Sequence, residues 1–263
     1  MKRLIAIPLL LSSAIASSIV VRHDVPDSSY LVQDSALAAL VDLPHEGHGV
    51  LVAPQWVLTV AHATQWHPVR EVMLNGERFE VERVVLHPGY RPLPPELLER
   101  DPEGAIRFLA GLDDIALIKL ATPATGVQPV VLYGGRDEMG KTVVFFGKGA
   151  TGNGISGQMD GANRTLLRRA ENIISAVEER ALVYTFDSDQ SARPLEGMLG
   201  NGDSGGPVLI YNDGRWELVG LARGRLSTAS PGFYGQESHQ VRVSYYLPWI
   251  EETKGGSRSG AQL

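Results

Sequence analysis

The segment GDSGGPVLIY at residues 202–211 carries the strongest indication of fold and chemistry in this chain. Its first half places Ser204 between glycines, which keep the surroundings of the side chain narrow and let backbone N–H groups point inward. Its second half is a run of apolar and β-branched residues that ends at the hairpin signal Asp213-Gly214. A run of this kind predicts a β-strand. The segment therefore predicts a reactive serine that leads directly into a strand.

Short apolar runs bounded by turn residues recur along the rest of the chain. The 29 glycines and 16 prolines make turns frequent. The clearest runs are residues 49–53, 56–60, 81–86, 115–120, 142–146 and 217–222. Short strands at this spacing are typical of an all-β sandwich or barrel. Helices are predicted only at residues 94–100, which begin with prolines, and at residues 245–253.

Length and composition exclude several classes of protein. The chain has 263 residues, of which 43% are hydrophobic, and a formal net charge of −6. It is long enough to bury a core and too apolar to be disordered throughout. The acidic balance argues against a nucleic-acid-binding protein, which usually carries a basic patch. The absence of cysteine excludes disulfides, thiolate metal sites and a cysteine nucleophile.

The N-terminus has the order of a secretory signal. Lys2 and Arg3 are basic, residues 4–11 are apolar apart from one proline, and residues 12–18 are mostly small. The apolar part is too short to cross a bilayer as a helix. We therefore predict a signal peptide at residues 1–18 and a secreted or periplasmic product without stable membrane insertion. The opposing interpretation is a buried N-terminal strand or helix.

A candidate base and a candidate carboxylate precede Ser204 in the chain. A hydroxyl is a poor nucleophile unless a base lies beside it, and His62, at the end of an apolar run, is a candidate. The base needs a carboxylate that fixes its tautomer and stabilises the imidazolium, and Asp114 stands directly before another strand. Each residue alone has an ordinary structural explanation. Together they predict nucleophilic catalysis by the serine.

These residues stand in motifs that resemble those of the trypsin/chymotrypsin family of serine endopeptidases, peptidase family S1. Residues 59–63 resemble the histidine motif, residues 114–120 the aspartate motif, and residues 201–207 the serine motif. Residues 242–250 resemble the last strand and the C-terminal helix of the family. The resemblance therefore runs nearly from end to end of the chain.

The resemblance implies an all-β fold of two six-stranded antiparallel β-barrels with a short C-terminal helix. Residues 19–263 would form one protease domain. Its two barrels would comprise roughly residues 19–128 and 129–254, and a flexible tail would follow. The active site would lie between the barrels.

The resemblance also implies a role for each motif residue. Ser204 would attack the scissile carbonyl, His62 would act as general base and then acid, and Asp114 would orient the imidazole. The backbone N–H groups of Gly202 and Ser204 would form the oxyanion hole. The expected substrate is a protein or peptide. No metal or other cofactor and no nucleic acid is expected, and the chain should be a monomer.

The start of the mature chain bears on activation. In this family a freed N-terminal Ile-Val pairs its ammonium with the aspartate before the catalytic serine, and the matching residues here are Ile19 and Asp203. Signal cleavage after Ser18 would free Ile19 directly. Cleavage after Ala16 would leave a dipeptide to be trimmed.

Several positions depart from the family pattern. Met198 stands at the base of the specificity pocket, where cleavage after Lys or Arg needs a carboxylate, so trypsin-like specificity is not expected. The other candidate substrate-binding residues are Asn201, Arg223 and Gly224. Arg223 or Arg225 favours acidic substrate residues by charge pairing, or both arginines face solvent. Residues 91–111 exceed the family's loop, and either restrict substrates or form a tolerated surface insertion.

The lack of cysteine is a further departure, because the family usually ties its histidine and serine loops with disulfides. Ala63 follows the histidine, and Gly200 stands where a cysteine would precede the serine motif. The barrels must therefore hold by packing alone. This favours a bacterial, cysteine-free member of the family.

Two other functions compete with this interpretation. The Gly-x-Ser-x-Gly pattern fits the nucleophile elbow of the α/β-hydrolases, with Asp213 and His239 as the remaining members of a triad, but that elbow leads into a helix. A protease-like binding protein is the other alternative. Such relatives usually lose one of the three catalytic residues, and all three are present here.

Overall fold

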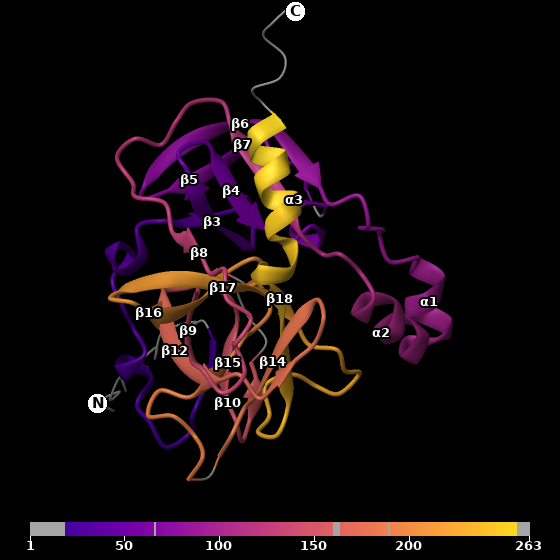
Figure 1. Cartoon of the computed structure of the whole chain (residues 1–263). Helices are drawn as coiled ribbons and strands as arrows, with labels where there is room; N and C mark the ends of the chain where they lie inside the picture. Colours follow the sequence, from indigo (N-terminus) through magenta and orange to yellow (C-terminus); the bar gives the residue numbers. More distant parts are fainter. Residues whose placement is uncertain (1–18, 66, 160–163, 189, 257–263) are drawn as a thin grey trace, which may run out of the picture.

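A computed structural model describes residues 19–65, 67–159, 164–188 and 190–256. The chain folds into two β-rich halves, one above the other in Figure 1. The predicted signal peptide at residues 1–18 and the C-terminal part of the predicted tail lie outside the described residues.

The first half is a closed barrel of six strands in the order β2-β3-β4-β7-β6-β5, with every pair antiparallel. Asn75 and Gly76 both have positive φ, which lets them form the tight turn between β5 and β6. The strands are β2 (Leu40–Asp42), β3 (His48–Ala53), β4 (Trp56–Thr59), β5 (Glu71–Leu74), β6 (Glu77–Leu86) and β7 (Ala116–Leu120).

The second half is an eight-stranded sheet that curls without closing its hydrogen-bond ladder. Seven strands follow the order β12-β9-β16-β17-β18-β14-β13, and β8 pairs with β17 in parallel. The all-β prediction is confirmed. This half differs from the expected six-stranded antiparallel barrel, because it has eight strands and because β8, in the segment that leads over from the first barrel, pairs with β17 in parallel. The strands are β8 (Val131–Leu132), β9 (Thr142–Gly147), β12 (Arg168–Ile173), β13 (Ala176–Val177), β14 (Ala181–Thr185), β16 (Pro207–Asn212), β17 (Arg215–Gly224) and β18 (Glu237–Arg242).

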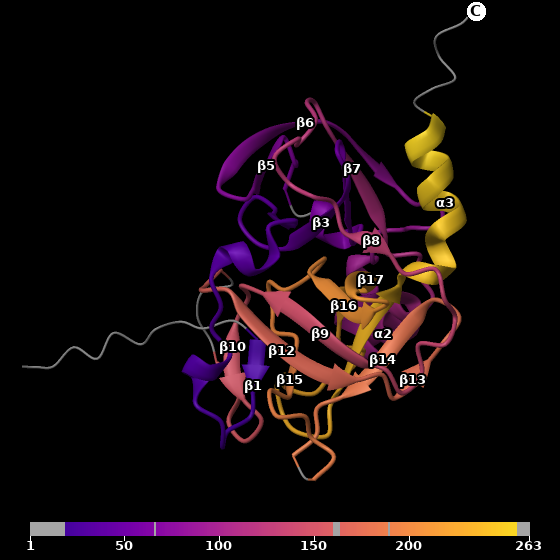
Figure 2. The same cartoon turned by 60° about the vertical axis from the view of Figure 1, so that its left-hand side comes forward.

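The first described strand joins a separate small sheet beside the second half, as Figure 2 shows. β1 (Ile19–Val21) lies between β10 (Thr151–Asn153), which runs parallel to it, and β15 (Gly197–Met198). β11 (Gly157–Gln158) completes this sheet. The start of the described chain is thus buried next to the segment that leads to Ser204.

Three α-helices accompany the strands in the described residues. The predicted helix near residue 94 is present as α1 (Pro95–Arg100), but a second inserted helix, α2 (Pro102–Ala110), was not predicted. Asp101 starts α2 by accepting a hydrogen bond from Gly104 N, and Pro102 suits its first turn. Figure 1 shows both helices beside the two halves. Three short 3-10 turns occur at Asp27–Ser29, Asp34–Leu37 and His62–Thr64.

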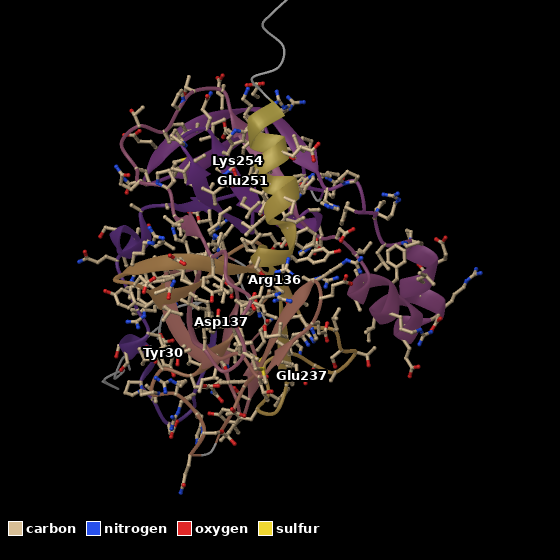
Figure 3. All side chains as sticks on the ribbon, in the orientation of Figure 1. Tyr30, Arg136, Asp137, Glu237, Glu251 and Lys254 are labelled. Atoms are coloured by element: carbon tan, nitrogen blue, oxygen red, sulfur yellow. The ribbon has the colours of Figure 1, made fainter. Side chains whose placement is uncertain are left out.

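The predicted C-terminal helix is α3 (Val243–Gly255), which begins two residues earlier than expected. Val243, Tyr246 and Ile250 are buried in one cluster with side chains of the first barrel. Figure 3 shows Glu251 and Lys254 on this helix, where they form an ion pair at 2.7 Å. α3 therefore joins the end of the second half to the first barrel. None of the helices in the described ranges has the length and apolar character needed to cross a membrane.

Candidate active site

His62 lies just beyond the end of β4 and begins a short 3-10 turn. The strand before it is fully buried, and Thr59 donates from its hydroxyl to the carbonyl of His48 at 2.6 Å. This contact ties the end of β4 to β3. The His62 side chain keeps 25% of its surface exposed, so most of the ring is covered by other residues and part of it remains accessible to solvent.

Asp114 stands two residues before β7 and is almost fully buried. Its Oδ1 accepts from the backbone N of His62 at 2.9 Å, and its Oδ2 lies 2.6 Å from His62 Nδ1. The adjacent Asp113 faces elsewhere: it accepts from the Tyr246 hydroxyl at 2.9 Å and lies 3.0 Å from Arg180 Nε. The structure thus separates two aspartates that are adjacent in sequence.

Ser204 lies in the loop between β15 and β16, flanked by Gly202 and Gly205, both with positive φ. His62 Nε2 is 2.9 Å from Ser204 Oγ. A carboxylate, an imidazole and a hydroxyl therefore form one hydrogen-bonded chain across the two halves of the molecule. Such a chain can take a proton from the hydroxyl and hold the resulting imidazolium.

The charge state of Asp114 suits this arrangement. Burial opposes ionisation of the carboxyl, but the charge and hydrogen bonds of His62, with a further contribution from Arg223, hold its pKa below the usual value. Asp114 is therefore an anion at neutral pH. An anion can fix the Nδ1–H tautomer of His62, which leaves Nε2 as the acceptor for the hydroxyl proton.

Backbone contacts orient the peptide groups around Ser204. The carbonyl of Asn201 accepts from Ala150 N at 2.6 Å, and that of Asp203 accepts from Gly206 N at 2.9 Å. In a trans peptide the N–H points opposite to the preceding carbonyl. The N–H groups of Gly202 and Ser204 therefore point away from these partners. Their orientation is fixed before any substrate binds, as an oxyanion hole requires.

The carboxylate of Asp203 is fully buried behind this loop. It accepts from Gly149 N at 2.7 Å and from Gly200 N at 2.8 Å. Burial raises its pKa to about 7, although these hydrogen bonds oppose the shift. Ile19, at the start of β1, is also fully buried and belongs to the core of the second half together with Met198.

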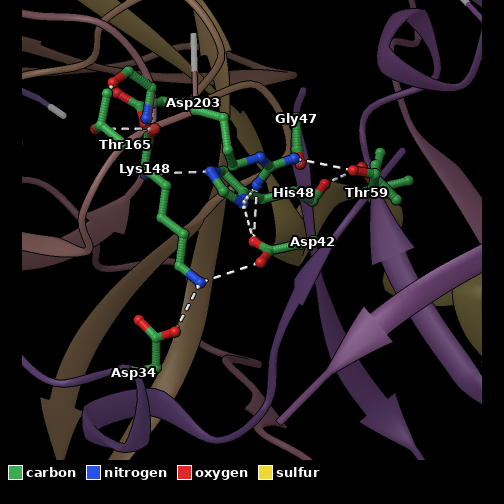
Figure 4. Close-up of polar contacts among 11 residues, drawn as sticks. Asp34, Asp42, Gly47, His48, Thr59, Lys148, Thr165 and Asp203 are labelled. Carbon is green, nitrogen blue, oxygen red and sulfur yellow. Dashed lines mark hydrogen bonds and ion pairs between the residues drawn. The ribbon is translucent and has the colours of Figure 1, made fainter. Parts of the chain in front are cut away.

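A charged cluster under the serine loop was not predicted from the sequence. It consists of Asp42, His48 and Lys148, which Figure 4 labels, together with Arg164. Lys148 Nζ lies 3.0 Å from Asp42, and Arg164 Nη1 donates to Asp42 at 2.8 Å. Because the backbone N of Lys148 donates to His48 Nε2, the proton of the neutral ring sits on Nδ1, 3.1 Å from Asp42.

This cluster holds the loop that carries Ser204. Arg164 Nη2 donates to the carbonyls of Leu43 and Gly47, at 2.9 and 3.0 Å. The backbone N of Gly47 donates to the Gly202 carbonyl, and that of His48 donates to the Ser204 carbonyl at 2.7 Å. The charged cluster thus holds the segment that leads into β3, and this segment holds the serine loop through two backbone hydrogen bonds.

Similarity to known proteins agrees with this geometry. Residues 33–250 match a family model described as Trypsin. The chain belongs to the trypsin family. It is 26% identical over 236 residues to vitamin K-dependent protein C of Mus musculus, a match that covers 79% of this chain and 46% of that protein. The chain thus spans about half the length of this curated relative.

A solved structure described as neuropsin, a serine protease expressed in the limbic system of mouse brain, has a similar fold. The TM-score is 0.66 at 22% sequence identity, and the match covers 86% of this chain and 98% of that one. At this identity the likeness concerns the fold alone. It agrees with the two β-rich halves and the C-terminal helix described above.

The remaining predicted site residues of this trypsin-family chain lie around the serine loop. Met198 is fully buried in β15, opposite Val20. Asn201 is exposed, and its backbone N donates to Gln158 at 2.9 Å. Gly224 ends β17 with φ 133°. The Arg223 side chain does not simply face solvent, because it is 7% exposed and its Nε lies 3.8 Å from Asp114 Oδ2. A contact between Arg223 and substrate stays a prediction.

A cavity of about 350 Å³ opens beside His62. The insertion contributes Pro92, Leu93 and Leu109 to its wall, so residues 91–111 shape the region next to the triad. The other lining residues are His62, Gln65, Tyr90, Leu112, Asp114, Arg223, Gly224, Arg225, Leu226 and His239. Among the described residues, no group of three or more His, Cys, Asp and Glu side chains is placed to hold a metal ion.

Proposed function

We propose that this chain is a serine endopeptidase that hydrolyses peptide bonds through an acyl-enzyme. The observation that carries the proposal is the hydrogen-bonded chain Asp114–His62–Ser204, with contacts of 2.6 and 2.9 Å. Membership of the trypsin family supports the same conclusion. Neither a metal nor another cofactor has a role in this chemistry.

In the proposed mechanism, His62 Nε2 takes the proton of Ser204 as Oγ forms a bond to the scissile carbonyl carbon. The N–H groups of Gly202 and Ser204 donate to the oxygen on which negative charge develops. His62 then gives its proton to the leaving amine as the peptide bond breaks. A water attacks the acyl-enzyme by the same route, and Asp114 stabilises the imidazolium in both steps.

Labelling by a fluorophosphonate tests the nucleophile. We expect the probe to form a covalent bond to Ser204 and the Ser204→Ala variant to remain unlabelled. A protease-like binding protein would leave both proteins unlabelled. The esterase alternative is disfavoured because Ser204 leads into β16 rather than into a helix. Hydrolysis of a small ester without any hydrolysis of peptides would favour that alternative again.

The proposed activation step uses the buried start of the described chain. Cleavage after Ser18 would create an ammonium on Ile19, and Asp203 is a buried carboxyl with a raised pKa that a nearby cation would stabilise as an anion. The signal peptide would then be the only segment to remove. N-terminal sequencing of active protein tests this: a start at Ser17 would contradict it.

The proposed specificity is not trypsin-like. Met198 supplies no carboxylate for a Lys or Arg side chain at the cleavage site, and its apolar side chain favours a medium or large apolar residue. Asn201 and Gly224 are proposed to border the bound peptide. Cleavage-site profiling with a peptide library tests this proposal, and strong cleavage after Lys or Arg would refute it.

We further propose that the chain acts as a monomer outside the cytoplasm, in the medium or the periplasm, on protein or peptide substrates. The signal-like N-terminus supports export. The lack of cysteine supports a bacterial product that folds without oxidation. Fractionation of a bacterial host that expresses the full chain tests export, and retention of the chain in the cytoplasm would contradict it.

A further inference from the structure

Arg223 has no role in the mechanism proposed above. The register between β17 and β18 shifts between Ala222 and Gly224, which places Arg223 at an irregularity of the strand. Irregularities of this kind redirect a side chain from the regular alternation of the sheet. Arg223 accordingly points into the molecule, and only 7% of its side-chain surface is exposed.

The guanidinium of Arg223 contacts two parts of the site at once. Its Nε lies 3.8 Å from Asp114 Oδ2, the same oxygen that is 2.6 Å from His62 Nδ1. Its Nη2 donates to the carbonyl of Leu109, in the last turn of α2. One side chain therefore connects the inserted helix to the carboxylate of the triad.

The charge of this group acts directly on the triad. A guanidinium stays protonated at any pH at which the protein is folded. It stabilises the Asp114 anion and disfavours a second cation on His62. The other titratable groups around the same cavity are Tyr90, Arg225 and His239, and among the described contacts none of them is paired with the Asp114 carboxylate.

We propose that Arg223 is a positioning residue of the triad: anchored to the insertion at Leu109, it holds the Asp114 carboxylate in place and sets a fixed positive charge beside the Asp114–His62 pair. The inference rests on the proposed function for its meaning in catalysis. The proposal also assigns a structural role to the insertion, because the Leu109 carbonyl of α2 is the acceptor that holds the guanidinium in place.

The test is the titration of the His62 ring, followed by NMR in the full chain on a Ser204→Ala background. That background prevents self-digestion, and the signal is assigned by its loss in His62→Ala. Arg223→Gln retains a donor for the Leu109 carbonyl but removes the charge. We expect its His62 midpoint to rise by about one pH unit, the size of effect that a charge at this range produces. Arg223→Lys should restore most of the native midpoint.

Arg180→Met is the matched control, because it removes an arginine that pairs at 3.0 Å with Asp113, the neighbour of Asp114. Its His62 midpoint should stay at the native value. Arg223→Met repeats the test should Arg223→Gln fail to fold. An unchanged midpoint in a folded Arg223→Gln or Arg223→Met protein would overturn the proposal, as would an equal shift in Arg180→Met.

A second readout separates this proposal from the proposed function. The rate of Ser204 labelling by a fluorophosphonate does not depend on the binding of a peptide, and its acidic limb should move to higher pH in Arg223→Gln. Native protein that shows no labelling would refute the serine endopeptidase function. The titration of His62 would still decide the role of Arg223.

Discussion

At the scale of single residues, the site depends on which of two similar groups faces the histidine. Asp113 and Asp114 are adjacent, but only Asp114 hydrogen-bonds to both the backbone and the ring of His62. Asp113 instead joins Tyr246 of α3 and Arg180. Asp113 therefore holds α3, and Asp114 holds His62, the proposed catalytic base.

Asp114→Asn is therefore expected to lower kcat by about four decades, the effect reported for this change in the well-studied Ser-His-Asp triad. The amide donates where the carboxylate accepted, so His62 adopts the wrong tautomer. Steady-state kinetics on a peptide substrate measures the loss. Asp113→Asn is the control and should retain kcat within about threefold, since it does not touch the ring. Equal losses in the two variants would contradict this assignment.

Arg164 is the residue through which the charged cluster reaches the serine loop. Arg164→Met removes its contacts with Asp42 and with the carbonyls of Leu43 and Gly47. We expect the free energy of unfolding to fall by about 2 kcal/mol, as for lost hydrogen bonds to a charged group. Urea unfolding measures it. Arg169→Met, which breaks a surface pair with Glu171, should cost less than about 0.5 kcal/mol. A similar loss of unfolding free energy in Arg164→Met and Arg169→Met would contradict the role of the charged cluster in holding the serine loop.

At the scale of elements, the insertion at residues 91–111 forms part of the wall of the cavity beside His62. α1 and α2 follow a proline-rich segment, and each begins with a proline in its first turn. The segment contributes apolar side chains to the cavity beside His62 and a carbonyl that holds Arg223. The insertion thus contributes to the site and does more than extend a surface loop.

Leu93→Ala tests whether substrates use this cavity. Loss of a leucine side chain removes apolar contact worth about 1.5 kcal/mol, so we expect KM for peptides with a large apolar residue on the non-primed side to rise about tenfold. The value of kcat should stay nearly unchanged, because the triad is not touched. Leu97→Ala is the control, since Leu97 belongs to the same insertion and is not part of the cavity wall. A KM that does not change in Leu93→Ala would place substrates elsewhere.

At the scale of the whole molecule, ion pairs with a buried partner join segments that are distant in the sequence. Fully buried Arg168 pairs with Asp27 through two hydrogen bonds, and Glu138 does the same with Arg242 at the start of α3. A cysteine at Gly200 has no room, because a Cβ there would lie 2.1 Å from the Ala150 carbonyl oxygen. Any side chain at position 200 would therefore require the neighbouring backbone to move.

The stability of the intact chain should depend on pH through Glu196. This carboxyl is buried, and burial raises its pKa from 4.5 to about 7. The folded state therefore holds a proton that the unfolded state releases between these values, so the stabilisation present below pH 4.5 is lost as pH rises toward 7. Urea unfolding of Ser204→Ala from pH 4.5 to 8 measures the slope.

Glu196→Gln should reduce that slope, because the amide does not titrate. Asp203, whose pKa burial also raises to about 7, keeps the remainder of the slope in this variant. Glu237→Gln is the control and should leave the slope as it is, since the Glu237 side chain is 62% exposed. Stability that declined equally with pH in Glu196→Gln and in the parent would show that another group is responsible.

The sequence alone determined the β-rich class and the family, and it predicted Ser204, His62 and Asp114 as the candidate site. All of these depend on local patterns: alternating apolar runs, turn residues and short motifs. α2 was not predicted because a nine-residue segment that contains a glycine has only a weak intrinsic preference for the helical conformation. In the structure, Asp101 caps the start of this helix. The strand count of the second half depends on long-range pairing, which no local pattern specifies.

Only the tertiary structure decided the distances within the triad, the separation of Asp113 from Asp114, and the direction of the Arg223 side chain. The last point shows the physical reason. From the sequence, solvent or a substrate carboxylate is the expected partner of Arg223. The irregularity in β17 turns the guanidinium inward, toward an anion and a carbonyl from segments more than 100 residues away. Contacts between such distant segments exist only once the whole chain has folded.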